Sequence, residues 1–203
     1  MKIFKSLILF VIIALVCSNL SFADSPITST PFYKAYLDYD IVAKAHESGV
    51  MDEEFANYLH SKENPIDVKA AVINALSWEF DGKKNADIYC SLIFYKTIKE
   101  IKNAKLNGDD LFCVGYLLVM DNYFKPERGI PFLNKAVKKL KSSYTVAMIN
   151  ALAEAQKAMD SDWCEVWNLI EDVIEDKNLE QDMKEGAVEI ILDYMRGYEE
   201  FCE

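Results

Sequence analysis

The sequence predicts an all-helical protein in which antiparallel helix pairs stack side by side as a short helical repeat, an α-α superhelix. Two observations predict this class. Nearly the same six residues occur twice, as AVINAL at 71–76 and as AMINAL at 147–152, and each copy lies in an apolar pattern of helical spacing. No segment shows the strict alternation of apolar and polar residues that a half-buried strand requires.

The first 23 residues have the parts of a secretory signal peptide. Lys2 and Lys5 precede an apolar run at 7–16, and a small residue, a spacer and Ala23 form the cleavage site. The run has about ten residues, well below the ~20 that span a bilayer. We expect cleavage after Ala23, a periplasmic or secreted protein, and no membrane span.

The mature chain, residues 24–203, is expected to form a single all-helical domain, and it is long enough for a sizeable core. A helical N-terminal part at 31–61 precedes two units at about 64–141 and 142–203. The expected helices are 31–49, 51–61, 64–81, 86–105, 109–124, 126–141 and 144–159.

The first helix of the first unit has clear signals at both ends. Asn64 suits the N-cap, Pro65 suits the first helical position, and Gly82 suits the left-handed residue that ends a helix. Its core-facing stripe is expected to consist of Val68, Val72, Ile73, Leu76 and Phe80.

The likeness between the two units continues beyond the six-residue copies. CSLI at 90–93 is matched by CEVWNLI at 164–170, and GYLLVMDNY at 115–123 by EIILDYMRGY at 189–198. All these pairs lie about 75 residues apart, and a steady offset favours an internal duplication. The alternative is a chance likeness between apolar helices.

Residues 126–140, PERGIPFLNKAVKKL, carry Gly129, Leu133 and Ala136 at a small, large, small spacing. This segment resembles the second helix of a tetratricopeptide repeat, while Gly115 in the preceding helix lies about two residues from the small position of that family. The resemblance covers one helix pair. It implies antiparallel helix pairs stacked side by side, and no particular activity.

The five cysteines indicate an exported, disulfide-bonded protein. Cys17 would carry the lipid of a lipoprotein, but the branched Val16 stands where a small residue is expected, so we favour soluble export. The even number left after cleavage favours disulfides. These four are Cys90, Cys113, Cys164 and Cys202. Three pairings are open, and the simplest for a duplicated chain is Cys90–Cys113 with Cys164–Cys202.

The sequence contains no catalytic or metal-binding pattern. His46 and His60 form no ligand pair of helical spacing, no serine lies in a glycine-framed turn, and no cysteines have C-x-x-C spacing. Glu79 and Asp81 are close enough to suggest a glycosidase pair, although adjacent acids at a helix end are usually solvated. We therefore expect no enzyme activity, no cofactor and no metal site.

Two groups of aromatic residues have different expected roles. Trp163 and Trp167 lie four residues apart on one helical face, which favours core packing. Tyr33, Tyr36 and Tyr39 cannot all share one face, so at least one of them is expected at the surface, where tyrosine favours interfaces.

Acidic residues concentrate at the C-terminal end. Residues 24–159 carry 18 acids and 17 bases, whereas residues 160–203 carry 15 acids and 3 bases, a net charge of −12. The acids at helical spacing are Glu171, Asp172, Glu175, Asp176, Glu185, Glu189 and Asp193. Like charges four residues apart each destabilise a helix by ~0.2–0.5 kcal/mol, so folding does not explain their accumulation.

These observations predict an exported, disulfide-stabilised, non-catalytic protein that binds a basic protein partner through these acids. The specific form that we expect is a periplasmic immunity protein that neutralises a basic toxin. Nucleic acid is excluded as a partner because phosphate binding needs clustered Lys and Arg. The alternatives are a helical-repeat scaffold of the cell envelope, an all-helical hydrolase, and an acidic face that only keeps the protein soluble.

Overall fold

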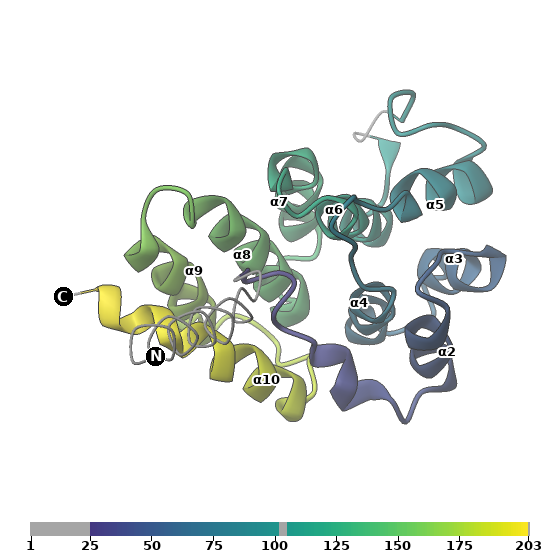
Figure 1. Cartoon of the computed structure of the whole chain (residues 1–203). Helices are drawn as coiled ribbons and strands as arrows, with labels where there is room; N and C mark the ends of the chain where they lie inside the picture. Colours follow the sequence, from purple (N-terminus) through teal and green to yellow (C-terminus); the bar gives the residue numbers. More distant parts are fainter. Residues whose placement is uncertain (1–24, 102–104, 203) are drawn as a thin grey trace, which may run out of the picture.

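The computed structural model describes residues 25–101 and 105–202, and this part of the chain consists of helices and the segments that connect them (Figure 1). The all-helical class is thus confirmed. The expected signal peptide lies outside the described residues. The elements are η1 (Phe32–Tyr36), α2 (Asp40–Ser48), α3 (Glu53–His60), α4 (Ile66–Ala75), α5 (Asn85–Phe94), α6 (Gly108–Asp121), η3 (Pro126–Arg128), α7 (Ile130–Lys139), α8 (Tyr144–Ala158), α9 (Trp163–Glu175), α10 (Glu185–Met195) and η4 (Arg196–Phe201).

Consecutive helices from α6 to α9 pack side by side: α6 contacts α7, α7 contacts α8, and α8 contacts α9 (Figure 1). The helix α4 lies among α2, η1, α6 and α8, and its apolar residues from Val68 to Ala75 are buried. Buried residues from η1 to η4 belong to one hydrophobic cluster. Within the described ranges, no helix is both long and apolar enough to cross a membrane.

The N-terminal segment packs against the last helix. Lys184, just before α10, donates its backbone N–H to the Tyr36 hydroxyl at 2.8 Å, and its ammonium group lies 2.7 Å from an Asp38 oxygen. The same ammonium group lies 4.7 Å from the ring centroid of Tyr39, which is 37% exposed. Tyr36 is buried, so the expectation that at least one of these tyrosines reaches the surface is met by Tyr39.

The helices α6 and α7 approach each other closely where α6 meets the start of α7. A Cβ atom at Gly129 would lie 2.2 Å from the Gly115 carbonyl oxygen, and one at Gly115 would lie 2.8 Å from Leu133 Cγ. Leu133 and Ala136 are fully buried on the same face of α7. The small, large, small spacing of this segment therefore serves close helix packing.

The two units differ in how their helices pack. In the C-terminal unit α8 packs extensively along α9, whereas α4 makes its main contacts with α2, η1 and α6. The counterpart of α9 by sequence, α5, packs against α3 and α6. The internal duplication therefore stays a prediction.

Two predicted helices end early, and both end at a left-handed residue that is not glycine. The helix expected at 64–81 stops at Ala75, because Ser77 has a φ of 60°. Phe80 therefore lies outside the apolar stripe and is 74% exposed. The helix expected at 86–105 stops at Phe94, because Tyr95 has a φ of 55° and donates its N–H to the Cys90 carbonyl.

The remaining expected helices are found with shorter bounds or are divided in two. The segment 31–49 forms η1 and α2, and the segment 126–141 forms η3 and α7 around Gly129. Asn64 does not cap α4, since its side-chain amide donates to the Tyr58 carbonyl and Pro65 holds the N-cap position instead.

Asp121 at the end of α6 fixes the start of α5. Its two carboxylate oxygens accept the backbone N–H groups of Asn85 at 3.0 Å and Ala86 at 2.8 Å. Burial raises the pKa of Asp121 from 3.8 to about 6, and the two N–H donors partly oppose this shift.

This raised pKa gives stability a defined pH dependence. Between about pH 4 and pH 6 the folded protein holds more protons at Asp121 than the unfolded chain does, so this contribution to the free energy of unfolding falls as pH rises. In urea titrations, the wild-type value minus that of Asp121→Asn should fall by roughly 2–3 kcal/mol between about pH 4 and pH 7. A difference that rises with pH would contradict the assignment.

Candidate functional site

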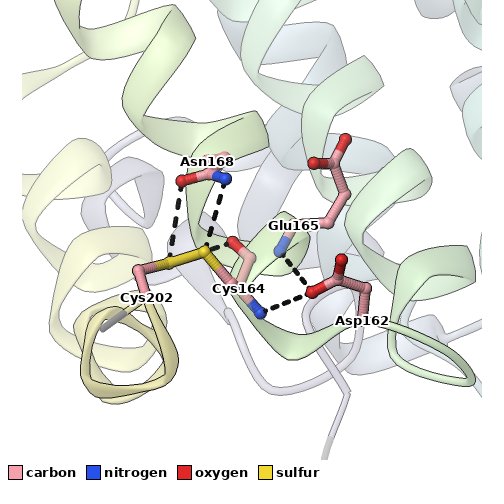
Figure 2. The surroundings of a disulfide bond; sticks show 5 residues. All are labelled: Asp162, Cys164, Glu165, Asn168 and Cys202. Atoms are coloured by element: carbon pink, nitrogen blue, oxygen red, sulfur yellow. Dashed lines mark hydrogen bonds between the residues drawn. A yellow bond between two sulfur atoms is a disulfide. The ribbon is translucent and has the colours of Figure 1, made fainter.

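The C-terminal acidic surface comprises the seven predicted acids, which lie in α9, at Asp176 directly after it, and in α10. The start of α9 is fixed by Asp162, whose carboxylate accepts the N–H groups of Cys164 and Glu165 at 3.1 and 3.2 Å (Figure 2). The α9 residues that face the core are Val166, Trp167 and Ile170. The α10 residues that face the core are Ala187, Ile191 and Met195.

Each helix turns its acids away from the core. Glu171 is half-buried, whereas the other six side chains are exposed. Glu185, Glu189 and Asp193 follow one another at intervals of four residues, so they form one stripe along the outer side of α10. The exposure of these acids agrees with a surface that is open to a partner.

The charges of this surface are almost entirely uncompensated. Among the described residues, only Asp193 of the seven makes an ion pair, at 3.6 Å from Arg196. Asp176 accepts hydrogen bonds from the backbone and side chain of Asn178 at 2.9 and 2.8 Å, which do not reduce its charge. The surface therefore carries a strong negative potential.

A disulfide joins the two ends of this region. Cys164 at the start of α9 is bonded to Cys202 after η4, with their Cα atoms 4.7 Å apart (Figure 2). The side chain of Asn168 lies against both sulfurs, with contacts of 3.4 and 3.6 Å. This is one of the two disulfides that the sequence predicts.

The two disulfide-bonded cysteines are part of the lining of an open hollow of about 820 Å³ between α9 and η4. The hollow is lined by Cys164, Trp167, Asn168, Glu171, Arg196, Glu199, Glu200 and Cys202. It brings Glu171 together with Glu199 and Glu200, two acids that the analysis of helical spacing missed. The predicted pairing of Cys202 with Cys164 could have indicated that Glu199 and Glu200 lie near α9. The acidic stripe of α10 does not line this hollow.

Exposed aromatic rings border the acidic surface. Trp163 and Phe201 are each 44% exposed, and their rings meet edge to face with centroids 4.8 Å apart. The expectation of a core position is therefore wrong for Trp163 and right for Trp167, which is 7% exposed. Trp163 reaches the surface because it is the first residue of α9, where its indole N–H donates to the Met159 carbonyl.

The predicted Cys90–Cys113 disulfide is wrong, because both thiols are free and buried. Cys113 lies on the side of α6 that faces α3, where its sulfur is 3.7 Å from the Leu59 carbonyl oxygen. Burial raises the pKa of Cys90 to about 12 and that of Cys113 further. Both thiols therefore stay protonated at neutral pH, which makes them poor nucleophiles.

The two histidines lie in different surroundings. His60 Nδ1 lies 2.8 Å from an Asp110 oxygen that also accepts the Tyr89 hydroxyl at 3.2 Å, a contact across 50 residues that sequence patterns do not reveal. His46 stacks on Tyr33 with ring centroids 4.8 Å apart. No group of three or more potential ligands in the described part of the chain is arranged to hold a metal ion.

The suggested carboxylate pair does not form a site. Glu79 lies 3.6 Å from the Lys83 ammonium group, and both Glu79 and Asp81 are exposed to solvent.

Comparison with known protein families, curated proteins and solved structures finds no match to this chain. The geometry and charge of the C-terminal acidic surface are therefore the basis for a functional proposal.

Proposed function

We propose that the protein is a non-catalytic binding protein whose C-terminal acidic surface docks on a basic protein. In its specific form, it is an exported immunity protein that covers the cationic substrate-binding surface of a toxin. The observation that carries the proposal is the row of uncompensated carboxylates on the outer sides of α9 and α10.

Energetics favour a binding role over a purely structural one. Repulsion between acids four residues apart costs each helix ~0.2–0.5 kcal/mol per pair. Among the described residues, only Arg196 forms an ion pair with one of these seven acids. A cationic partner would remove this repulsion, and the potential would steer its approach and raise the association rate.

Exposed aromatic residues supply the apolar contacts that a charged surface alone lacks. Trp163 and Phe201 directly precede the two disulfide-bonded cysteines and contact each other, and Tyr39 lies next to Lys184 just before α10. Aromatic residues of this kind often contribute most of the binding energy at protein interfaces. The proposal thus combines electrostatic steering with three candidate anchor residues.

Export is part of the proposal. It is supported by the signal-peptide pattern of the first 23 residues and by the Cys164–Cys202 disulfide, a bond that is typical of oxidising compartments. A periplasmic location would place the protein where a cell-wall or membrane-acting toxin operates.

A second candidate is a scaffold of the cell envelope built on a tetratricopeptide-like helical repeat. The side-by-side packing of α6 to α9 and the close approach of Gly115 and Gly129 favour it. Repeats of this kind bind partners on their concave face. The two candidates differ in the surface used, so variants of the acidic surface separate them.

The test is capture of partners from an envelope extract of the native cells, using mature protein that carries an affinity tag. We expect one basic protein in stoichiometric amount, and we expect its loss with the triple variant Glu185→Gln, Glu189→Gln, Asp193→Asn, because the stripe on α10 loses its charge. The bound proteins are quantified by mass spectrometry.

A matched control carries Glu47→Gln, Glu63→Gln and Asp81→Asn, three exposed acids outside the C-terminal acidic surface. Both triple variants change the net charge equally, so only the position of the charge differs. Retention of the basic protein by the control and its loss by the α10 variant would support docking through the acidic surface. Equal capture of the basic protein by both variants would contradict the proposal and favour the scaffold.

A further inference from the structure

A second hollow, of about 440 Å³, lies between the end of α5 and the start of α6. Its size is in the range of pockets that bind small ligands. It is lined by Phe94, Lys96, Glu100, Ile101, Lys105, Leu106, Asn107 and Asp110. None of these residues belongs to the C-terminal acidic surface.

One part of the lining is apolar. Phe94 and Ile101 are half-buried, and Leu106 is 8% exposed. The Phe94 ring is held edge to face by the rings of His60 and Tyr89, each with its centroid 5.9 Å away. These residues offer a preformed surface for an aliphatic chain or an aromatic ring.

The acids of the hollow already have partners within the protein. Asp110 is 4% exposed, lies 2.8 Å from His60 Nδ1 and accepts the Tyr89 hydroxyl, so its carboxylate lies deep in the site. Glu100 accepts the backbone N–H and the hydroxyl of Thr97 at 2.9 and 2.8 Å. These bonds lower the pKa of Glu100 and hold its carboxylate close to Thr97.

Two lysines, Lys96 and Lys105, also line the hollow. Lys96 and Lys105 are exposed, and neither makes an ion pair within residues 25–101 and 105–202. The exposed rim therefore carries the ammonium groups of Lys96 and Lys105 beside the Glu100 carboxylate, whose pKa is also lowered by the charge of Lys96.

We propose that this hollow binds an amphiphilic anion. The apolar part of the ligand lies on Phe94, Ile101 and Leu106, and its carboxylate, sulfonate or phosphate is held at the rim by Lys96 and Lys105. Ammonium groups bind such anions through charge-assisted hydrogen bonds. The ligand could be a free amphiphile or the head and upper chain of an anionic lipid, since the recognised chemistry is the same.

The probe is 1-anilinonaphthalene-8-sulfonate, a fluorescent aromatic sulfonate, titrated against the folded mature protein. We expect one saturable site, displacement by decanoate, and no displacement by decanol, because decanol lacks the charge. The double variant Lys96→Gln, Lys105→Gln should bind the probe at least about tenfold more weakly than the wild type does. Circular dichroism checks that each variant keeps its fold, since partly unfolded proteins bind this dye non-specifically.

The matched control is Lys138→Gln with Lys141→Gln, two exposed lysines that do not line the hollow. Unchanged probe affinity in the control and weakened affinity in the Lys96/Lys105 variant would support the site. Equal affinity in both variants, or equal displacement by decanol and decanoate, would overturn it.

Vesicles distinguish the two sources of the ligand. Sedimentation with phosphatidylglycerol vesicles but not with phosphatidylcholine vesicles, lost in the Lys96/Lys105 variant, would assign the site to an anionic lipid. Binding of decanoate without sedimentation would assign it to a free amphiphile. If neither binds, the proposal is wrong, whatever the capture of basic proteins by the C-terminal acidic surface shows.

Discussion

Replacement of Gly129 by alanine is expected to lower the free energy of unfolding by about 3 kcal/mol. The new Cβ would lie 2.2 Å from the Gly115 carbonyl oxygen and 2.6 Å from Val119 Cγ2. A backbone oxygen within a helix cannot move aside as a flexible side chain can. The helices α6 and α7 would have to separate, and the packing around Leu133 would be lost with them.

Urea titration followed by circular dichroism measures this change. Gly186→Ala is the matched control, because it lies in the first turn of α10 and its Cβ would meet only Ala35 Cβ, at 3.8 Å. Alanine there should be neutral or stabilising by up to about 1 kcal/mol. A loss below about 1 kcal/mol for Gly129→Ala would contradict the close contact of α6 with α7.

Loss of the Cys164–Cys202 disulfide is expected to have the largest effect on stability. The bond closes a loop with a sequence separation of 38 residues. The loop-entropy treatment gives about 4 kcal/mol for a loop of this length. The double variant Cys164→Ser, Cys202→Ser should therefore unfold at lower urea concentration, and the segment after η4 should lose its covalent link to α9.

Two observations check the origin of this effect. Dithiothreitol should destabilise the wild type and leave the double variant unchanged, since Cys90 and Cys113 are free thiols. Alkylation of the unreduced, denatured mature protein should modify those two cysteines alone. Modification of all four, or of none, would show that the assigned pairing is wrong.

Much of the fold could be predicted from local signals in the sequence. The helix α8 begins at Tyr144 as expected, because Ser143 is a capping residue whose hydroxyl accepts the Val146 N–H. Helix ends were harder to predict. Ser77 and Tyr95 adopt a left-handed conformation that glycine normally occupies. The residue types at these positions therefore did not predict the ends of α4 and α5.

The candidate site was predictable to the extent that it depends on helical spacing. Acids four residues apart on α10 had to share one side of that helix, and they lie opposite the buried Ile191. Glu199 and Glu200 were missed because the short helix η4 was not foreseen. The cysteine pairing succeeded at Cys164–Cys202 and failed at Cys90, because which side of α6 faces α5 depends on tertiary packing.

The hollow beside α5 could not be predicted from sequence. It depends on the turn at Tyr95, which places Phe94 and Lys96 in the same lining, and on the contact between His60 and Asp110. These residues come from separate elements, and none of them belongs to a recognisable motif.

The central claim is that the C-terminal acidic surface binds a cationic protein by electrostatic complementarity. The most direct measurement is the dissociation constant of the complex with the captured protein, compared between about 20 mM and about 500 mM NaCl, where the Debye length falls from roughly 20 Å to roughly 4 Å. We predict that affinity falls by about tenfold or more over this range, with a smaller fall for the Glu185/Glu189/Asp193 variant. An affinity that is independent of salt, or equal salt dependence in the wild type and the variant, would contradict the account.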